Sequence, residues 1–270
     1  MALIAHLSDP HFGTEQPVVM RALQTLLWKE APQLLIVSGD ITQRARRSQF
    51  SHALAFVDSL RIPHRLVIPG NHDIPLFNLA ARMLAPYRRH RHAFGEELEP
   101  VYRDDTTLAI TVNTTRAYRH EDGEVSTEQI DRVCTQLQDA SPQQLRLVIT
   151  HQPVYVTEAR DESNLLHGHE KAVSAWAEAG ADLILGGHIH LPFVMPLHEK
   201  RPGLVRRIWA VQAGTAVSTR IRRHADNSIN LIRYQGRQSP CMIERWDYVE
   251  GQQQFMQLAT HALSLEGASA

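Results

Sequence analysis

Short apolar runs recur along the chain and predict buried strands. The runs before residue 190 span residues 3–7, 34–37, 65–68, 108–112, 145–149 and 182–185. Their length and β-branched content are typical of strands that are covered on both faces. Between several of them lie segments with helical periodicity, such as residues 50–60 and 130–137. This alternation of strands and helices predicts an α/β fold.

The pattern changes in the last quarter of the chain. After residue 205 it predicts strands without intervening helices, at residues 208–212, 229–234 and 242–248. An apolar tail follows at residues 251–270, and we expect it to be helical. Because α/β chains of roughly 200 to 250 residues often form one domain, we expect a single domain over residues 1–270, with a strand-rich part at about 205–250.

Composition and charge narrow the functional classes. Apolar residues make up 43% of the chain, which is enough to bury a large core. A formal net charge of -1 supplies no overall field that would attract a polyanion, so nucleic acid is not the expected partner. Charged residues or histidines interrupt every apolar run well before the ~18 residues of a membrane span, so no membrane association is expected. Cys134 and Cys241 lie far apart and no signal peptide is apparent, which favours a cytoplasmic protein.

Residue types that bind metals follow five of the predicted strands. These motifs are Asp9-Pro10-His11, Gly39-Asp40, Gly70-Asn71-His72-Asp73, His151-Gln152-Pro153 and Gly187-His188-Ile189-His190. The carboxyl ends of strands in an open α/β sheet border one crevice, so the five loops can converge. Carboxylates, imidazoles and an amide oxygen together suit Mn, Fe or Zn. Each motif alone has an ordinary explanation as a cap or a turn, but five independent strand ends favour one shared metal site.

The ordered motifs resemble those of the calcineurin-like metallophosphoesterases, over residues 3 to about 235. Within that superfamily the chain is most similar to bacterial class III cyclic nucleotide and glycerophosphodiester phosphodiesterases. The resemblance implies a four-layer αββα sandwich of two mixed sheets flanked by helices, with two divalent metal ions. Carried over by position, it implies ligands Asp9, His11, Asp40 and His190 for one ion, and Asp40, Asn71, His151 and His188 for the other. Asp40 would bridge the ions, and a metal-bridging hydroxide would attack phosphorus in line.

The same resemblance implies roles in catalysis and substrate binding. His72 would act as the general acid on the leaving oxygen, with Asp73 or another neighbouring group fixing its tautomer. Asn71 and His72 would both contact substrate. Arg116 and Arg220 lie in segments that border the pocket in these relatives, and either could hold a phosphate oxygen through its planar fork. An exposed structural role remains equally open for each arginine. The basic runs at residues 44–47 and 88–92 are interpreted as solvated helix faces.

Two departures from familiar patterns bear on the substrate. His151 is followed by Gln152, where many phosphodiesterase-like members have a second histidine. Lipid A pathway pyrophosphatases usually have arginine where this chain has His72, which disfavours that function. The expected substrate is a small-molecule phosphodiester, either a 3′,5′-cyclic nucleotide or a glycerophosphodiester. The alternatives are a phosphomonoesterase or nuclease on the same metals, or a non-catalytic scaffold, which normally has lost ligands. The C-terminal strands and tail could also build a homodimer interface.

Overall fold

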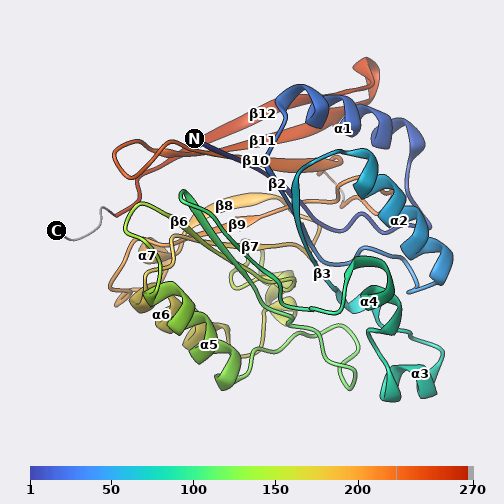
Figure 1. Ribbon diagram of the computed structural model, residues 1–270, viewed down its shortest axis with the longest axis horizontal. Coiled ribbons are helices and arrows are strands. Elements are labelled where there is room, and N and C mark those ends of the chain that lie inside the picture. Colours follow the sequence, from blue (N-terminus) through green and yellow to red (C-terminus); the bar gives the residue numbers. More distant parts are fainter. Residues whose placement is uncertain (223, 267–270) are drawn as a thin grey trace.

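Two six-stranded mixed sheets form the centre of the computed structural model, which describes residues 1–222 and 224–266 (Figure 1). The first sheet contains, in spatial order, β12 (Gln254–Leu263), β11 (Cys241–Val249), β10 (Ser228–Tyr234), β1 (Ala2–Leu7), β2 (Leu34–Ser38) and β3 (His64–Ile68). The second contains β4 (Val101–Arg103), β5 (Thr107–Thr111), β6 (Leu145–Ile149), β7 (Leu183–Gly186), β9 (Trp209–Gln212) and β8 (Phe193–Pro196). In the first sheet β1, β2 and β3 are parallel, and β10 pairs antiparallel with β1. In the second sheet β5, β6 and β7 are parallel, and the edge strands β4 and β8 pair antiparallel with their neighbours.

Helices cover the outer face of each sheet (Figure 1). The first sheet is covered by α1 (Pro17–Glu30) and α2 (Arg47–Ser59), and the second by α5 (Thr127–Gln138) and α6 (His169–Ala179). The shorter helices are α3 (Leu79–Leu84), α4 (Arg88–Phe94) and α7 (Leu197–Lys200). Short 3₁₀ helices occur at η1 (Asn71–Asp73), η2 (Ala159–Asn164) and η3 (Glu250–Gln252).

Three hydrophobic clusters separate the four layers. One lies between the first sheet and its helices, one between the two sheets, and one between the second sheet and its helices. Alternate residues of β1 contribute to different clusters: Leu3 and Ala5 to the outer one, Ile4 to the one between the sheets. A strand with both faces covered needs apolar side chains at every position, which explains the continuous apolar runs. The predicted αββα sandwich is thereby confirmed.

The C-terminal tail was predicted to be helical, and this was wrong. Residues Gln254–Leu263 form β12, which pairs antiparallel with β11 and ends the first sheet. Phe255 and Leu263 point into the core, while Met256 and Leu258 remain exposed. The partner that satisfies the backbone hydrogen bonds of the tail is β11, and local apolar spacing does not reveal such a partner. Residues 267–270 of the predicted tail lie outside the described residues.

His90 in α4 is a buried histidine, and neither of its ring nitrogens has a hydrogen-bond partner among the described residues. Its ring packs 5.5 Å from that of Phe94 and 6.2 Å from that of Phe50, measured between centroids. Burial, with a smaller contribution from the charge of Arg91, lowers the pKa of His90 to about 3. The folded protein therefore keeps this imidazole neutral.

The lowered pKa of His90 predicts a loss of stability in mild acid. Below an unfolded pKa of about 6.5 the unfolded chain binds this proton more readily, so stability present above pH 6.5 falls as the pH drops toward 3. We expect His90→Phe to lose less free energy of unfolding between pH 7 and pH 5 than the wild type, by roughly 2 kcal/mol. Urea unfolding at both pH values measures this, with the exposed His120→Phe as control. An unchanged pH dependence in His90→Phe would contradict the assignment.

Candidate metal centre

The five sequence motifs meet where β1, β2, β3, β6 and β7 end. Donor atoms of the described residues form three overlapping groups in which all atoms lie within 4.8 Å of one another. The groups are Asp9, His11 and His190; His11, Asp40 and His72; and Asp40, His151 and His188. Asn71, the remaining predicted ligand, places its Oδ1 3.2 Å from Nε2 of His151. The structure thus brings all seven predicted ligands to one place.

The first group is organised around two imidazoles that face each other. His11 Nε2 lies 3.1 Å from His190 Nε2, and Asp9 Oδ1 lies 3.8 Å and 3.4 Å from these two nitrogens. The Nδ1–H of His190 donates to the carbonyl of Arg220 at 2.5 Å, which directs Nε2 toward Asp9 and His11. Such outer hydrogen bonds fix the tautomer of metal-binding histidines.

Asp40 belongs to two of the three groups, the one with His11 and His72 and the one with His151 and His188. Asp40 Oδ2 lies 3.7 Å from His11 Nε2, whereas Asp40 Oδ1 lies 3.3 Å from His151 Nε2. The Nδ1–H of His151 donates to the carbonyl of Ser38 at 2.8 Å, so its Nε2 also points inward. One carboxylate therefore presents a different oxygen to each of these two groups.

The loops reach this geometry through left-handed backbone. Five predicted ligands have positive φ although they are not glycine: Asp9 at 52°, His11 at 42°, Asp40 at 48°, His188 at 71° and His190 at 56°. Such residues are uncommon and cluster at functional sites, where the surrounding structure holds them in place. Close packing adds to this constraint, since a Cβ atom at Gly187 would overlap Ser8 Oγ, and one at Gly70 would overlap the backbone of Asp40.

The electrostatics of the cluster favour bound positive charge. Burial opposes ionisation of Asp9 and Asp40, but the neighbouring histidines outweigh it and hold the pKa of both carboxyls below the usual range. Burial also opposes the charged form of His151, yet the adjacent Asp40 raises its pKa to about 9. Asp9 Oδ1 and His188 Nδ1 are buried without a hydrogen-bond partner among the described residues. Oxygen and imidazole donors that converge and remain unpaired fit divalent cations.

His72 stands beside this cluster and is oriented by the loop after Asp40. Its Nδ1–H donates to the carbonyl of Gln43 at 3.0 Å, and its backbone N–H donates to Asp40 Oδ1 at 2.9 Å. Arg220 Nη1 lies 3.3 Å from His72 Nε2 and donates to Gln43 Oε1 at 3.1 Å. The group that fixes the tautomer of His72 is therefore Gln43, a residue that no sequence motif had indicated.

The hydrogen bonds of Asp73 differ from those expected of a residue that fixes the tautomer of His72. Its carboxylate accepts backbone N–H groups of Ile41, Thr42 and Gly70 at 3.0, 2.8 and 2.9 Å, and the hydroxyl of Thr42 at 2.8 Å. Burial and the charge of Asp40 raise its pKa to about 6. Asp73 thus joins the loop after β2 to the loop after β3, and its hydrogen bonds are made to groups other than the His72 ring.

Residues 2–192 match the family model described as calcineurin-like phosphoesterase. The chain belongs to this family.

Two curated relatives of this phosphoesterase carry phosphodiesterase names. It is 26% identical over 204 residues to a probable cyclic nucleotide phosphodiesterase of a Synechococcus species, covering 71% of this chain and 74% of the relative. It is 25% identical over 202 residues to the glycerophosphodiester phosphodiesterase GpdQ of Enterobacter lignolyticus, covering 70% of each chain. A solved dimetal phosphatase from Danio rerio shares the fold, with a TM-score of 0.66, 12% identity and coverage of 98% and 99% of the two chains.

Family membership implies a metal-dependent phosphoester hydrolase, and the described residues contain candidate metal-binding clusters. Among those residues, no helix of the phosphoesterase has both the length and the apolar character needed to cross a membrane.

The two predicted phosphate-binding arginines of the phosphoesterase lie in different surroundings. Arg220 faces His72, as described above. The Arg116 guanidinium donates to the carbonyls of Asn113 and Thr115, both at 2.9 Å, and to Gln129 Oε1 at 2.7 Å. Arg116 also lines a cavity of about 390 Å³ together with Asn113 and Gln129. The structure thus places Arg220 beside the ligand cluster, while Arg116 has its fork occupied by its own neighbourhood.

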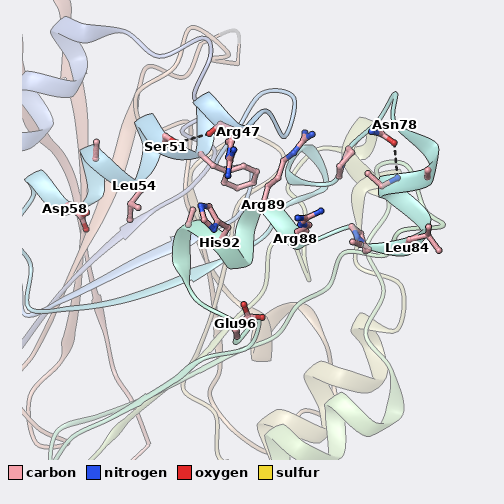
Figure 2. Close-up of a pocket in the computed structure, with 18 residues that line it drawn as sticks. Arg47, Ser51, Leu54, Asp58, Asn78, Leu84, Arg88, Arg89, His92 and Glu96 are labelled. Atoms are coloured by element: carbon pink, nitrogen blue, oxygen red, sulfur yellow. Dashed lines mark hydrogen bonds between the residues drawn. The ribbon is translucent and has the colours of Figure 1, made fainter.

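A second feature of the phosphoesterase is a cavity of about 1020 Å³ between α2, α3 and α4 (Figure 2). Arg47, Arg88, Arg89 and His92 line it, so side chains from both predicted basic runs gather there. The seven predicted ligands lie elsewhere, and the carboxylates and imidazoles that could perform phosphoester chemistry therefore do not border this cavity. Pocket size alone does not mark the candidate centre in this fold.

Proposed function

We propose that this phosphoesterase uses two metal ions to hydrolyse small phosphodiesters, with 3′,5′-cyclic nucleotides or glycerophosphodiesters as the substrate class. The main support is the position of the two carboxylate oxygens of Asp40. Oδ2 faces His11 at 3.7 Å, and Oδ1 faces His151 at 3.3 Å. The phosphodiesterase names of two relatives support the choice of a diester.

The donor set fits two ions of the Mn, Fe or Zn type. Asp9, His11, Asp40 and His190 would hold one, and Asp40, Asn71, His151 and His188 the other. When bound, the pair would polarise a phosphoryl oxygen and make water a nucleophile near neutral pH. The carbonyls of Ser38 and Arg220 keep His151 and His190 in the tautomer that offers Nε2 to the centre.

The residues beside the centre suit the binding and protonation of a phosphate ester. The planar guanidinium of Arg220 can bind a phosphate oxygen bidentately, and Asn71 lies at the edge of the donor cluster. A phosphate that takes the hydrogen bonds of Arg220 would free Nε2 of His72, which now lies 3.3 Å from Arg220 Nη1. With Nδ1–H bound to Gln43, a proton on Nε2 is the one that His72 can donate to the leaving oxygen. Arg116 is retained as a second proposed substrate contact.

Hydrolysis of two chromogenic esters by metal-stripped protein tests this function. We expect Mn, Fe or Zn to restore turnover of bis(p-nitrophenyl) phosphate in preference to p-nitrophenyl phosphate. Preference for the monoester would establish a phosphomonoesterase, and preference for single-stranded DNA over both would establish a nuclease. Absence of turnover with every metal would favour a non-catalytic scaffold. A diester preference leads to a panel of cyclic nucleotides and glycerophosphodiesters.

The proposal also covers the cellular location, the domain organisation and the oligomeric state of the protein. We propose a cytoplasmic protein of one domain over residues 1–270, and the cysteines at positions 134 and 241 are both free thiols, which suits a reducing compartment. We also propose a homodimer, supported by β12, which forms one edge of the first sheet and exposes Met256 and Leu258.

A further inference from the structure

We propose that Asn164 is a positioning residue that fixes the tautomer of His188, and that Arg222 holds Asn164 in place for this task. Asn164 is the last residue of η2 and belongs to none of the five motifs. Asn164 Oδ1 lies 3.2 Å from His188 Nε2. The inference rests on the proposed metal centre, because it states how one ligand of that centre is oriented.

The hydrogen bond decides which nitrogen of His188 is free. An amide oxygen only accepts, so Nε2 carries the proton that Asn164 Oδ1 receives, and a neutral ring then has its lone pair on Nδ1. His188 Nδ1 is buried and has no partner among the described residues, and His188 belongs to the donor group of Asp40 and His151. The backbone N–H of His188 donates to Asp9 Oδ2 at 2.9 Å, which anchors the residue from its other side. Nδ1 is therefore the atom that His188 offers to a cation.

This arrangement differs from that of two other predicted ligand histidines, His151 and His190. His151 and His190 donate through Nδ1–H to the backbone carbonyls of Ser38 and Arg220, and they present Nε2. His188 uses the opposite tautomer and takes its partner from a side chain. A backbone carbonyl persists in any variant, whereas Asn164 can be replaced, so the orientation of His188 depends on a residue that mutation can remove.

Arg222 connects the turn that carries Asn164 to the loop that carries His188. It donates to Asp161 Oδ1 at 3.0 Å and to Glu158 Oε2 at 2.7 Å, both on the η2 side. It also donates to the carbonyl of Ile189, next to His188, at 3.2 Å. Asp161 is only 6% exposed, and the loss of one partner of a buried ion pair is strongly destabilising locally. One guanidinium thus connects the two segments that carry Asn164 and His188.

Removal of this kind of partner typically costs 10- to 100-fold in metal affinity. We therefore expect Asn164→Ala to weaken binding of Mn²⁺ to one of the two positions by roughly 10- to 100-fold. Asn164→Asp keeps an oxygen at the same place and should retain wild-type affinity within a few-fold. Ser163→Ala, an exposed neighbour on the same turn, is the matched control and should bind Mn²⁺ as the wild type does.

Two measurements separate this inference from the proposed function. Long-range ¹H–¹⁵N NMR of the metal-free protein reads the tautomer of His188, which we expect as Nε2–H in the wild type and in Asn164→Asp but not in Asn164→Ala. Arg222→Gln should loosen the same tautomer preference. Calorimetric titration with Mn²⁺ then gives the affinities. An unchanged tautomer and unchanged affinity in Asn164→Ala would overturn the inference, whereas failure of the wild type to bind any of Mn²⁺, Fe²⁺ and Zn²⁺ would overturn the proposed function.

Discussion

Asp40→Ala is expected to abolish phosphodiester hydrolysis and to remove metal from both positions of the centre. Asp40 places its two oxygens toward different donor groups, with Oδ2 facing His11 at 3.7 Å and Oδ1 facing His151 at 3.3 Å. A ligand shared by two ions serves both, so its loss should lower the affinity for each. Turnover of bis(p-nitrophenyl) phosphate and metal content after gel filtration give the two readouts.

A matched variant keeps the Asp40 experiment specific. Asp58→Ala removes an aspartate that is 56% exposed on α2, and it should leave turnover and metal content as in the wild type. Circular dichroism of Asp40→Ala verifies that the fold persists. Near-normal turnover of a folded Asp40→Ala protein would rule out the two-metal account.

His72→Ala is expected to keep its metal and to lose roughly 10²- to 10⁴-fold in turnover, the usual contribution of general acid–base catalysis. The expectation follows from the orientation of the ring, whose Nδ1–H is bound to the Gln43 carbonyl and whose Nε2 faces Arg220. His72 also belongs to a donor group with His11 and Asp40. Loss of metal in His72→Ala would therefore make it a ligand or a structural residue.

Esters with different leaving groups test whether His72 acts as a general acid or only fills space. An alkoxide needs a proton as it departs, whereas p-nitrophenolate needs far less assistance. The loss in His72→Ala should consequently be larger with a glycerophosphodiester than with bis(p-nitrophenyl) phosphate. Equal losses on both esters would contradict the acid role. His120→Ala, which removes an exposed histidine, is the control.

Much of this fold follows from local pattern. Continuous apolar runs predicted the central strands of both sheets because strands covered on two faces cannot alternate. The number of sheets came instead from family resemblance, since a run such as residues 145–149 does not reveal which strand lies beside it. The two short edge strands β4 and β8 went unpredicted, and β12 was mistaken for a helix because its partner β11 is not visible in its own spacing.

The candidate site likewise contains residues that the sequence predicts and residues that it does not. Its predicted ligands occur in short motifs directly after strands, so their convergence follows from the geometry of a sheet. The groups that orient His72 and His188 do not follow in this way: Gln43 binds His72 through a backbone carbonyl, and Asn164 lies 24 residues before His188 in the chain. A carbonyl carries no sequence signal at all, and a single asparagine in a polar turn has no distinguishing one. The three-dimensional structure was needed to find them.

We propose that two metal ions held by these residues drive diester hydrolysis. The decisive experiment is stepwise addition of Mn²⁺ to the metal-stripped protein, with turnover of bis(p-nitrophenyl) phosphate followed at each step. Activity should rise until two ions are bound per chain and then stay constant. Full activity with a single bound ion, or hydrolysis by the metal-free protein, would contradict it.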